Sequence, residues 1–284
     1  MSPVRISRVV LALVVLCTAG CAGGVPGVAP VAERRVPQAA PPSVGTSLGS
    51  SVGTSVGKVV TAVPPEPATA PVTVATCPAN LAAQLSRTEA ASQLITVDAP
   101  ASRATSATLT AWQRSGRCWV RASGPWIARL GYKGVSDHHS EGDGTTPSGA
   151  YGIGSEMYGN GPDPGVRYGY RLLACGDWWD EDPNSPFYNT FQHVTCGTKP
   201  PFGGSSEALW TFATAYRSFA VIDYNIAPAR PFGGSAVFLH DDVGGPTNGC
   251  VSLASTSLTT LLRWLRPAAS PLIVIGTDAE IRKL

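Results

Sequence analysis

Short apolar segments separated by glycine- and proline-rich turns recur from residue 93 onward, and this spacing limits the possible folds most strongly. Several segments alternate apolar and polar residues, which is the pattern of half-buried strands. They span residues 93–97, 107–112, 118–122, 128–132, 150–154, 219–224, 236–240 and 272–275, with a hairpin turn at Ser115 and Gly116. With 31 glycines and 25 prolines in 284 residues, the chain has little room for long helices. The sequence therefore predicts a mainly β domain, a β-sandwich or a barrel-like sheet, with one or two short helices.

Two segments have a helical pattern. Residues 81–91 are a candidate N-terminal helix. In residues 257–266 four leucines recur at helical spacing on one face, and Pro267 ends the segment; they are Leu258, Leu261, Leu262 and Leu265. Because 43% of the chain is hydrophobic, these elements have enough apolar surface to pack around a core.

The N-terminus resembles an export signal rather than a folded element. Arg5 and Arg8 supply positive charge before an apolar run over residues 9–16, and small residues then lead to Cys21. We expect a signal peptide over residues 1–20 and lipidation of Cys21, with cleavage nearby and no lipid as the alternative. This predicts an exported protein of the cell envelope, anchored by lipid to the outer face of the cytoplasmic membrane and acting in the periplasm or cell wall. No apolar run approaches the roughly 18 residues of a membrane-spanning helix.

Residues 21–75 have the composition of a tether. Proline, alanine, glycine, serine, threonine and valine dominate, and charged residues are few. Such a segment buries too little apolar surface to offset its ordering entropy. As a flexible coil it reaches on the order of 40 Å. The sequence thus predicts a disordered tether followed by a catalytic domain over residues 76–284, with its core at 93–276.

The charge balance argues against nucleic acid as a partner. The chain has 21 basic and 19 acidic residues, which gives a net charge of +2. Binding to a phosphate backbone requires a marked basic surplus.

Cysteine numbers single out one thiol. Of seven cysteines, Cys17 leaves with the signal and Cys21 is the lipidation candidate; the others are Cys77, Cys118, Cys175, Cys196 and Cys250. Export favours disulfides, and the simplest pairing of sequence neighbours is Cys77–Cys118 and Cys175–Cys196. The sequence does not prove this pairing. It leaves Cys250 free, and no close-spaced second ligand pair supports a zinc site, so we expect no metal.

The chemistry is concentrated between residues 238 and 253. His240 ends a predicted strand, a Gly/Pro loop follows, and Cys250 precedes the predicted helix. A cysteine needs a base or a positive neighbour to become a thiolate near neutral pH. Gly249 allows the backbone to approach a substrate, and the amides nearby are candidates for an oxyanion hole. On spacing alone, a glycine-rich turn with a buried cysteine and an incidental histidine is an open alternative.

The sequence around this cysteine resembles a known family. Residues 247–251 (Thr-Asn-Gly-Cys-Val) are similar to the Ser/Thr-His-Gly-Cys signature of L,D-transpeptidases, the YkuD family, in its exported, actinobacterial-like lipoprotein subgroup. Residues 141–154 resemble the family's Thr-Pro-Thr-Gly-x-Phe/Tyr-x-Ile segment. Residues 235–240 and 271–275 are similar to its penultimate and last strands, so the resemblance covers about residues 93–276. Asn248 departs from the usual histidine and Ser252 from the usual arginine or asparagine, which leaves details of substrate recognition open.

The resemblance assigns roles residue by residue. Cys250 is the expected nucleophile and His240 the general base, oriented by the backbone carbonyl of Asp241. Gly249 supplies backbone to the oxyanion hole. The expected substrate-binding residues are Thr247, Asn248 and Tyr151, together with Tyr224, which is a candidate because it lies at the end of a strong predicted strand.

The resemblance also implies the reaction. Cys250 forms a thioester with a peptidoglycan stem peptide, and an amine of a second stem resolves it into a 3→3 cross-link. If water resolves the thioester, the enzyme is an L,D-carboxypeptidase. Carbapenems are expected to acylate Cys250, and no cofactor is needed. The non-enzyme alternative is a wall-binding lipoprotein. A sortase has a different context around its cysteine, and papain-like peptidases have cysteine before histidine.

Two further polar clusters have more than one interpretation. His138, His139, Glu141 and Asp143 share a glycine-rich loop, which is a solvated loop, a lid over the acyl site or a metal site. Residues 177–182 (Asp-Trp-Trp-Asp-Glu-Asp) are either a surface loop anchored by tryptophans or a contact for a substrate ammonium or sugar.

Overall fold

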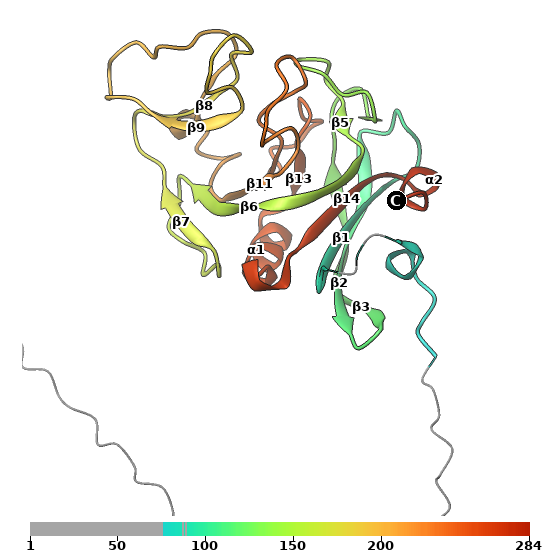
Figure 1. Cartoon of the computed structure of the whole chain (residues 1–284). Helices are drawn as coiled ribbons and strands as arrows, with labels where there is room; N and C mark the ends of the chain where they lie inside the picture. Colours follow the sequence, from blue (N-terminus) through green and yellow to red (C-terminus); the bar gives the residue numbers. More distant parts are fainter. Residues whose placement is uncertain (1–75, 87, 89) are drawn as a thin grey trace, which may run out of the picture. The chain divides into compact units, whose positions relative to one another are not determined.

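The structure, a computed structural model, describes residues 76–86, 88 and 90–284 (Figure 1). The predicted signal peptide, Cys21 and the predicted tether lie outside these residues. Within the described part of the chain, no helix has the length and apolar character needed to cross a membrane.

The main sheet is nine-stranded and closes on itself. Its strands are β1 (Gln93–Ala99), β2 (Ser106–Ser115), β3 (Cys118–Arg129), β6 (Gly149–Gly159), β7 (Gly169–Leu172), β11 (Phe219–Ile222), β12 (Phe238–Asp241), β13 (Val251–Leu253) and β14 (Leu272–Thr277). Their order is β11-β12-β13-β3-β2-β1-β14-β6-β7. Because β11 also pairs with β6, the strands from β11 to β6 form a ring and β7 is added outside it. The predicted mainly β, barrel-like fold is confirmed.

The strand pattern predicted most of this sheet. The 107–112 and 118–122 segments form the antiparallel β2–β3 hairpin, whose register runs from Ser115↔Cys118 to Ser106↔Arg129. The same register shows that residues 128–132 are not a separate strand. Residues 128 and 129 are the end of β3, which stays paired with β2 up to Arg129 despite shifts in register near Ala111.

The predicted leucine stripe forms helix α1 (Ser255–Trp264). Leu258, Leu261 and Leu262 are fully buried in the main core, as is Leu265, the residue that ends the helix. Residues of β12 alternate between two cores: Leu239 packs in the main core, whereas Phe238 packs in a second core on the other face. The strand that carries His240 is therefore covered on both sides.

The predicted helix over residues 81–91 is wrong. Among the described residues of this segment, the helical element is a 3-10 turn, η1 (Leu81–Gln84), capped by the Asn80 side chain, which accepts from the Ala83 N–H. Contacts with β3 hold this segment in place: the Asn80 amide donates to the Trp119 carbonyl at 2.9 Å, and Cys77 forms a disulfide with Cys118. Leu85 then continues with extended backbone against the core, so tertiary anchoring outweighs helix propensity here.

A small three-stranded sheet stands apart from the main one, and the strand pattern did not predict it. It consists of β8 (Asp177–Asp180), β9 (Thr190–His193) and β10 (Glu207–Ala208), in the order β10-β8-β9, followed by η2 (Leu209–Thr211). In Figure 1 β8 and β9 stand above β11 and β6. The Cys175–Cys196 disulfide closes its base, and Trp179 packs edge-on against Phe238, with ring centroids 5.0 Å apart.

The remaining short elements complete the domain. They are β4 (Val135–Ser136), β5 (Thr146–Pro147), η3 (Pro267–Ala269) and α2 (Asp278–Ile281). β4 and β5 pair in parallel and hold the loop between them, which includes His139 and Glu141, beside the Cys250 loop.

Candidate active site

The loop before Cys250 is fixed by Thr247. The Thr247 hydroxyl donates to the Cys250 carbonyl at 2.7 Å and accepts from the Gly249 N–H at 3.1 Å. The Thr247 backbone exchanges hydrogen bonds with Leu130 and Tyr132 in the segment after β3. The polar side chain of Thr247 thus shapes the turn and does not line the cavity beside the thiol.

Gly249 adopts a conformation that favours glycine. Its φ is +152°, and an added Cβ would lie 2.9 Å from the Thr145 carbonyl oxygen. The loops of Thr145 and Cys250 therefore approach each other more closely than a side chain at position 249 allows.

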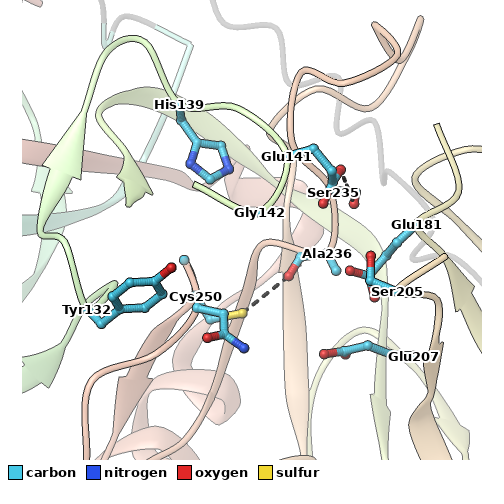
Figure 2. Close-up of a pocket in the computed structure, with 12 residues that line it drawn as sticks. Tyr132, His139, Glu141, Gly142, Glu181, Ser205, Glu207, Ser235, Ala236 and Cys250 are labelled. Carbon is cyan, nitrogen blue, oxygen red and sulfur yellow. Dashed lines mark hydrogen bonds between the residues drawn. The ribbon is translucent and has the colours of Figure 1, made fainter. Parts of the chain in front are cut away.

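Cys250 is the free cysteine of the described residues, and its thiol is held by backbone groups (Figure 2). The Phe238 N–H donates to Sγ at 3.3 Å, and the thiol donates to the Ala236 carbonyl at 3.2 Å. Burial raises the pKa of the Cys250 thiol, and nearby Glu207 and Glu181 raise it further, while the Phe238 N–H acts in the opposite direction. A base is therefore needed to form the thiolate near neutral pH.

His240 lies on the same sheet face as the thiol but does not contact it through a hydrogen bond. The parallel register pairs Leu239 with Val251 and His240 with Ser252, so Cys250 falls beside Phe238. The His240 Nδ1 atom is 2.8 Å from the Asp241 carbonyl oxygen, and the ring packs edge-on against Tyr216. Burial lowers the pKa of His240, so the imidazole is neutral near pH 7. No hydrogen bond of the described residues joins it to Cys250.

The thiol opens into a cavity of about 310 Å³. Its lining comes from the β4–β5 loop, the small sheet and the Cys250 loop: Tyr132, His139, Glu141, Gly142, Glu181, Ser205, Glu207, Ser235, Ala236, Asn248, Gly249 and Cys250. Three of the catalytic and substrate-binding residues expected from the sequence line this cavity: Asn248, Gly249 and Cys250.

The two tyrosines expected to bind substrate lie behind this lining. The Tyr224 hydroxyl donates to the Gly233 carbonyl at 2.7 Å, and its ring meets the His139 ring edge-on, with centroids 5.2 Å apart. The Tyr151 hydroxyl donates to the Ser148 carbonyl at 2.6 Å, and its ring contacts Tyr224. Both therefore support the loop that carries His139.

His139 is the histidine that lines the cavity, whereas its neighbour His138 is exposed. Its Nδ1 atom is 3.0 Å from Thr145 Oγ1 and 3.1 Å from Asp143 Oδ1. Burial lowers the pKa of His139, although the Asp143 and Glu141 carboxylates oppose that shift. Figure 2 shows its ring above Cys250. Among the described residues, no group of three or more His, Cys, Asp or Glu side chains is arranged to hold a metal ion.

Residues 92–275 match the family model described as YkuD, L,D-transpeptidase catalytic domain. The chain belongs to the YkuD family. No curated protein and no solved structure matches the chain. YkuD domains are cysteine-dependent acyltransferases that act on peptidoglycan and are generally sensitive to carbapenems.

The cysteine pairing of this YkuD chain bears on its location. Cys77 is joined to Cys118 and Cys175 to Cys196, the same neighbours that the sequence order favoured. Disulfides form and persist in oxidising compartments, so the two bridges indicate an exported protein.

Sequence reasoning missed part of the cavity of this YkuD domain. Glu207 and Ser205 belong to no motif, and Ser235, which begins the segment similar to the family's penultimate strand, was given no role; only the fold brings the three to the thiol. Glu181 was one residue of an acidic run with two interpretations, and Trp179 of the same run is buried while Glu181 faces the cavity. The one sequence signal for this part of the cavity was the acidic run over residues 177–182, which lies between Cys175 and Cys196.

Proposed function

We propose that this chain is a peptidoglycan L,D-transpeptidase that forms 3→3 cross-links between stem peptides through a thioester on Cys250. The observation that carries the proposal is the free thiol, which lines a cavity at the end of the Gly249 turn in a YkuD domain. A cavity of this size beside the thiol accommodates a peptide side chain and the reacting carbonyl.

In the first step Cys250 Sγ attacks the carbonyl carbon between the diamino acid and the terminal D-alanine of a tetrapeptide stem. His240 takes the thiol proton at Nε2, since its Nδ1–H is directed to the Asp241 carbonyl. The Gly249 N–H already donates to Thr247, so we assign the oxyanion to the Cys250 N–H. Collapse of the tetrahedral intermediate breaks the peptide bond, and D-alanine leaves with the proton from His240.

In the second step the side-chain amine of another stem attacks the thioester carbonyl. The C–S bond breaks, a new amide bond forms and Cys250 regains its proton. Attack by water instead gives the tripeptide and makes the enzyme an L,D-carboxypeptidase.

The proposed organisation places this chemistry outside the cytoplasmic membrane. Residues 1–20 act as the signal peptide, Cys21 carries the lipid, and residues 21–75 tether the catalytic domain at 76–284. The two disulfides and the peptidoglycan substrate of YkuD domains support an envelope location. Replacement of Cys21 by alanine is expected to release the protein from the membrane fraction.

The test compares the purified full chain with its Cys250→Ala variant. Each is incubated with disaccharide-tetrapeptide, and the products are analysed by mass spectrometry. A cross-linked dimer that lacks one D-alanine, absent with the variant, supports the proposal. Tripeptide alone shifts the function to the carboxypeptidase. No turnover and no carbapenem adduct on Cys250 would leave a wall-binding lipoprotein as the better account.

A further inference from the structure

Three glutamates from separate segments line the cavity on the side opposite Tyr132 (Figure 2). Glu141 comes from the β4–β5 loop, Glu181 follows β8 and Glu207 begins β10. No lysine or arginine lines the cavity, and no ion pair of the described residues involves these three side chains. The cavity is therefore acidic and has no cation of its own.

Glu141 and Glu207 are held by hydroxyl donors. The Tyr188 hydroxyl donates to Glu141 Oε2, as does the Ser235 hydroxyl at 2.7 Å. The Tyr216 hydroxyl donates to Glu207 Oε2. These two carboxylates are thus positioned within the structure before any ligand binds.

Glu181 differs, because part of its carboxylate has no partner. The residue is only 8% exposed, and its Oε1 atom is buried and makes no hydrogen bond. Leaving a buried carboxylate oxygen without a donor is unfavourable, and folded proteins rarely do so. In Figure 2 the Glu181 carboxylate points toward Ala236, on the side where the thiol lies. A ligand that enters the cavity with a hydrogen-bond donor would satisfy this oxygen.

We propose that the Glu181 side of this cavity, with Glu141 and Glu207, binds the cationic side-chain amine of the acceptor stem peptide. This inference rests on the proposed transpeptidase function and names the residues that select its second substrate. An ammonium group carries three donors and a positive charge, which match an unpartnered carboxylate oxygen among like charges. Water and a neutral acceptor supply no charge to offset the three acids.

The electrostatics of the cavity agree with such a ligand. Burial raises the pKa of Glu181, and the neighbouring Glu207, Glu141 and Asp180 carboxyls raise it further, whereas a hydrogen bond from the Glu207 backbone acts in the opposite direction. Burial likewise raises the pKa of Glu207. A bound ammonium would reverse the repulsion among these carboxyls and favour their ionised forms.

The same site accounts for the proton that the amine must lose. The ammonium transfers one proton to the Glu181 carboxylate, and the neutral amine attacks the thioester carbonyl. The C–S bond breaks, the new amide nitrogen loses its second proton to the leaving thiolate, and Glu181 later releases its proton to solvent. Once Glu181 holds that proton, one of the two acids that raise the pKa of Cys250 is neutral, so the departing thiolate meets less repulsion.

The experiment separates acylation from acceptor use in the full chain. Wild type and Glu181→Gln are acylated with disaccharide-tetrapeptide or a carbapenem, and adduct formation on Cys250 is timed by mass spectrometry. Cross-linking is then measured against increasing acceptor with a free side-chain amine, and against the same acceptor with that amine acetylated. We expect Glu181→Gln to acylate at least as fast as wild type, because it removes one of the acids that raise the pKa of Cys250. We expect it to raise the acceptor KM by about tenfold or more and to release more tripeptide.

Matched variants show whether the effect belongs to this carboxylate. Glu156→Gln makes the same change in an exposed ion pair with Arg171 and should leave both steps unchanged. Glu181→Asp keeps the charge and should retain part of the acceptor affinity. It therefore tests the inference even if Glu181→Gln folds poorly. An unchanged acceptor KM with normal acylation would overturn the inference and leave the transpeptidase proposal intact. A raised KM for the donor instead would move the ammonium to the donor stem and also overturn it. Wild-type protein that forms no adduct would overturn the proposed function itself.

Discussion

At the scale of single residues, the thiol and its proposed base are in surroundings that oppose ionisation. Burial and two nearby carboxyls raise the pKa of Cys250, and burial lowers the pKa of His240. These directions favour a neutral thiol and a neutral imidazole over a preformed ion pair, so we expect proton transfer to accompany substrate binding. His139, which also lines the cavity, is the competing candidate for the base. Thr145 contacts its Nδ1 atom, so Nε2 is the ring nitrogen that would accept a proton.

We expect His240→Ala to slow carbapenem acylation of Cys250 by at least about 100-fold, the usual contribution of a general base. His139→Ala should have a much smaller effect, since His139 is assigned to the cavity wall. Stopped reactions read by mass spectrometry give both rates. The reverse order of effects would transfer the role of base to His139.

Gly249 gives a second test at this scale. In Gly249→Ala the new Cβ meets the Thr145 carbonyl oxygen at 2.9 Å and the backbone keeps a φ that favours glycine. We expect a loss of about 1–3 kcal/mol in the free energy of unfolding, together with slower acylation. Gly245→Ala in the same loop is the control, because nothing lies within 4 Å of its added Cβ. Equal denaturation midpoints for the two variants would contradict this assignment.

The raised pKa of Glu181 predicts a pH dependence of stability. A carboxyl whose pKa is higher in the folded than in the unfolded chain contributes its full stability below the unfolded value, about pH 4.3, and loses it as pH rises. We expect the Tm of wild type to fall between about pH 5 and pH 9 relative to Glu181→Gln, which does not ionise. Thermal unfolding at a series of pH values measures the two slopes, and parallel slopes would exclude a raised pKa at Glu181.

At the scale of elements, the small sheet that carries Glu181 depends on its disulfide. Cys175 and Cys196 are 21 residues apart, and Cys77 and Cys118 are 41 apart. In the chain-entropy model, loss of the first bridge lowers the free energy of unfolding by about 3 kcal/mol and loss of the second by about 4 kcal/mol. We expect protease cleavage within residues 177–208 when Cys175 and Cys196 are replaced by serine. The Cys77 and Cys118 double variant should resist cleavage there, and equal digestion patterns would contradict a local role.

The elements that sequence reasoning predicted are those with strong periodicity. The leucines of α1 and the alternating residues of β2 and β3 predicted these elements, because each element buries one face and the apolar residues recur with its period. The region 81–91 lacked such a face, and Asn80 and Leu85 were positioned by contacts with β3 and the core instead. Strands β8 and β10 are too short to show a period, so the sequence left them as loops.

The same limit applies to the candidate site. The order of His240, Gly249 and Cys250 in the chain is visible because a short loop leads from the strand of His240 to the other two. The acidic wall is not visible, since Glu141, Glu181 and Glu207 lie on three segments that meet only through the small sheet and the β4–β5 pairing. Residue type and local spacing thus predict the reacting groups, whereas the fold is needed to find what faces them.

At the scale of the whole molecule, the closed sheet depends on the segment that precedes β1. The Cys77–Cys118 bridge, the Asn80 contact with Trp119 and the bond from the Ser86 hydroxyl to the Leu284 carbonyl join this segment to β3 and to the C-terminus. Ala82 and Leu85 are buried with Ile281 in a third, smaller core. The family match begins at residue 92 and therefore leaves out a segment whose contacts stabilise the catalytic domain.

A chain shortened to residues 76–284 is accordingly expected to unfold in one transition and to be acylated by a carbapenem at the rate of the full chain. A chain shortened to residues 92–284 loses the bridge and the two buried side chains. We expect its Tm to be lower by several degrees, since removing a native disulfide alone costs about 2–5 kcal/mol. Calorimetry on the two shortened chains measures the difference, and timed adduct formation on Cys250 shows whether the site survives. Equal Tm values would mean that the core from β1 onward is self-sufficient and that the segment before it serves only to connect the domain to residues 21–75.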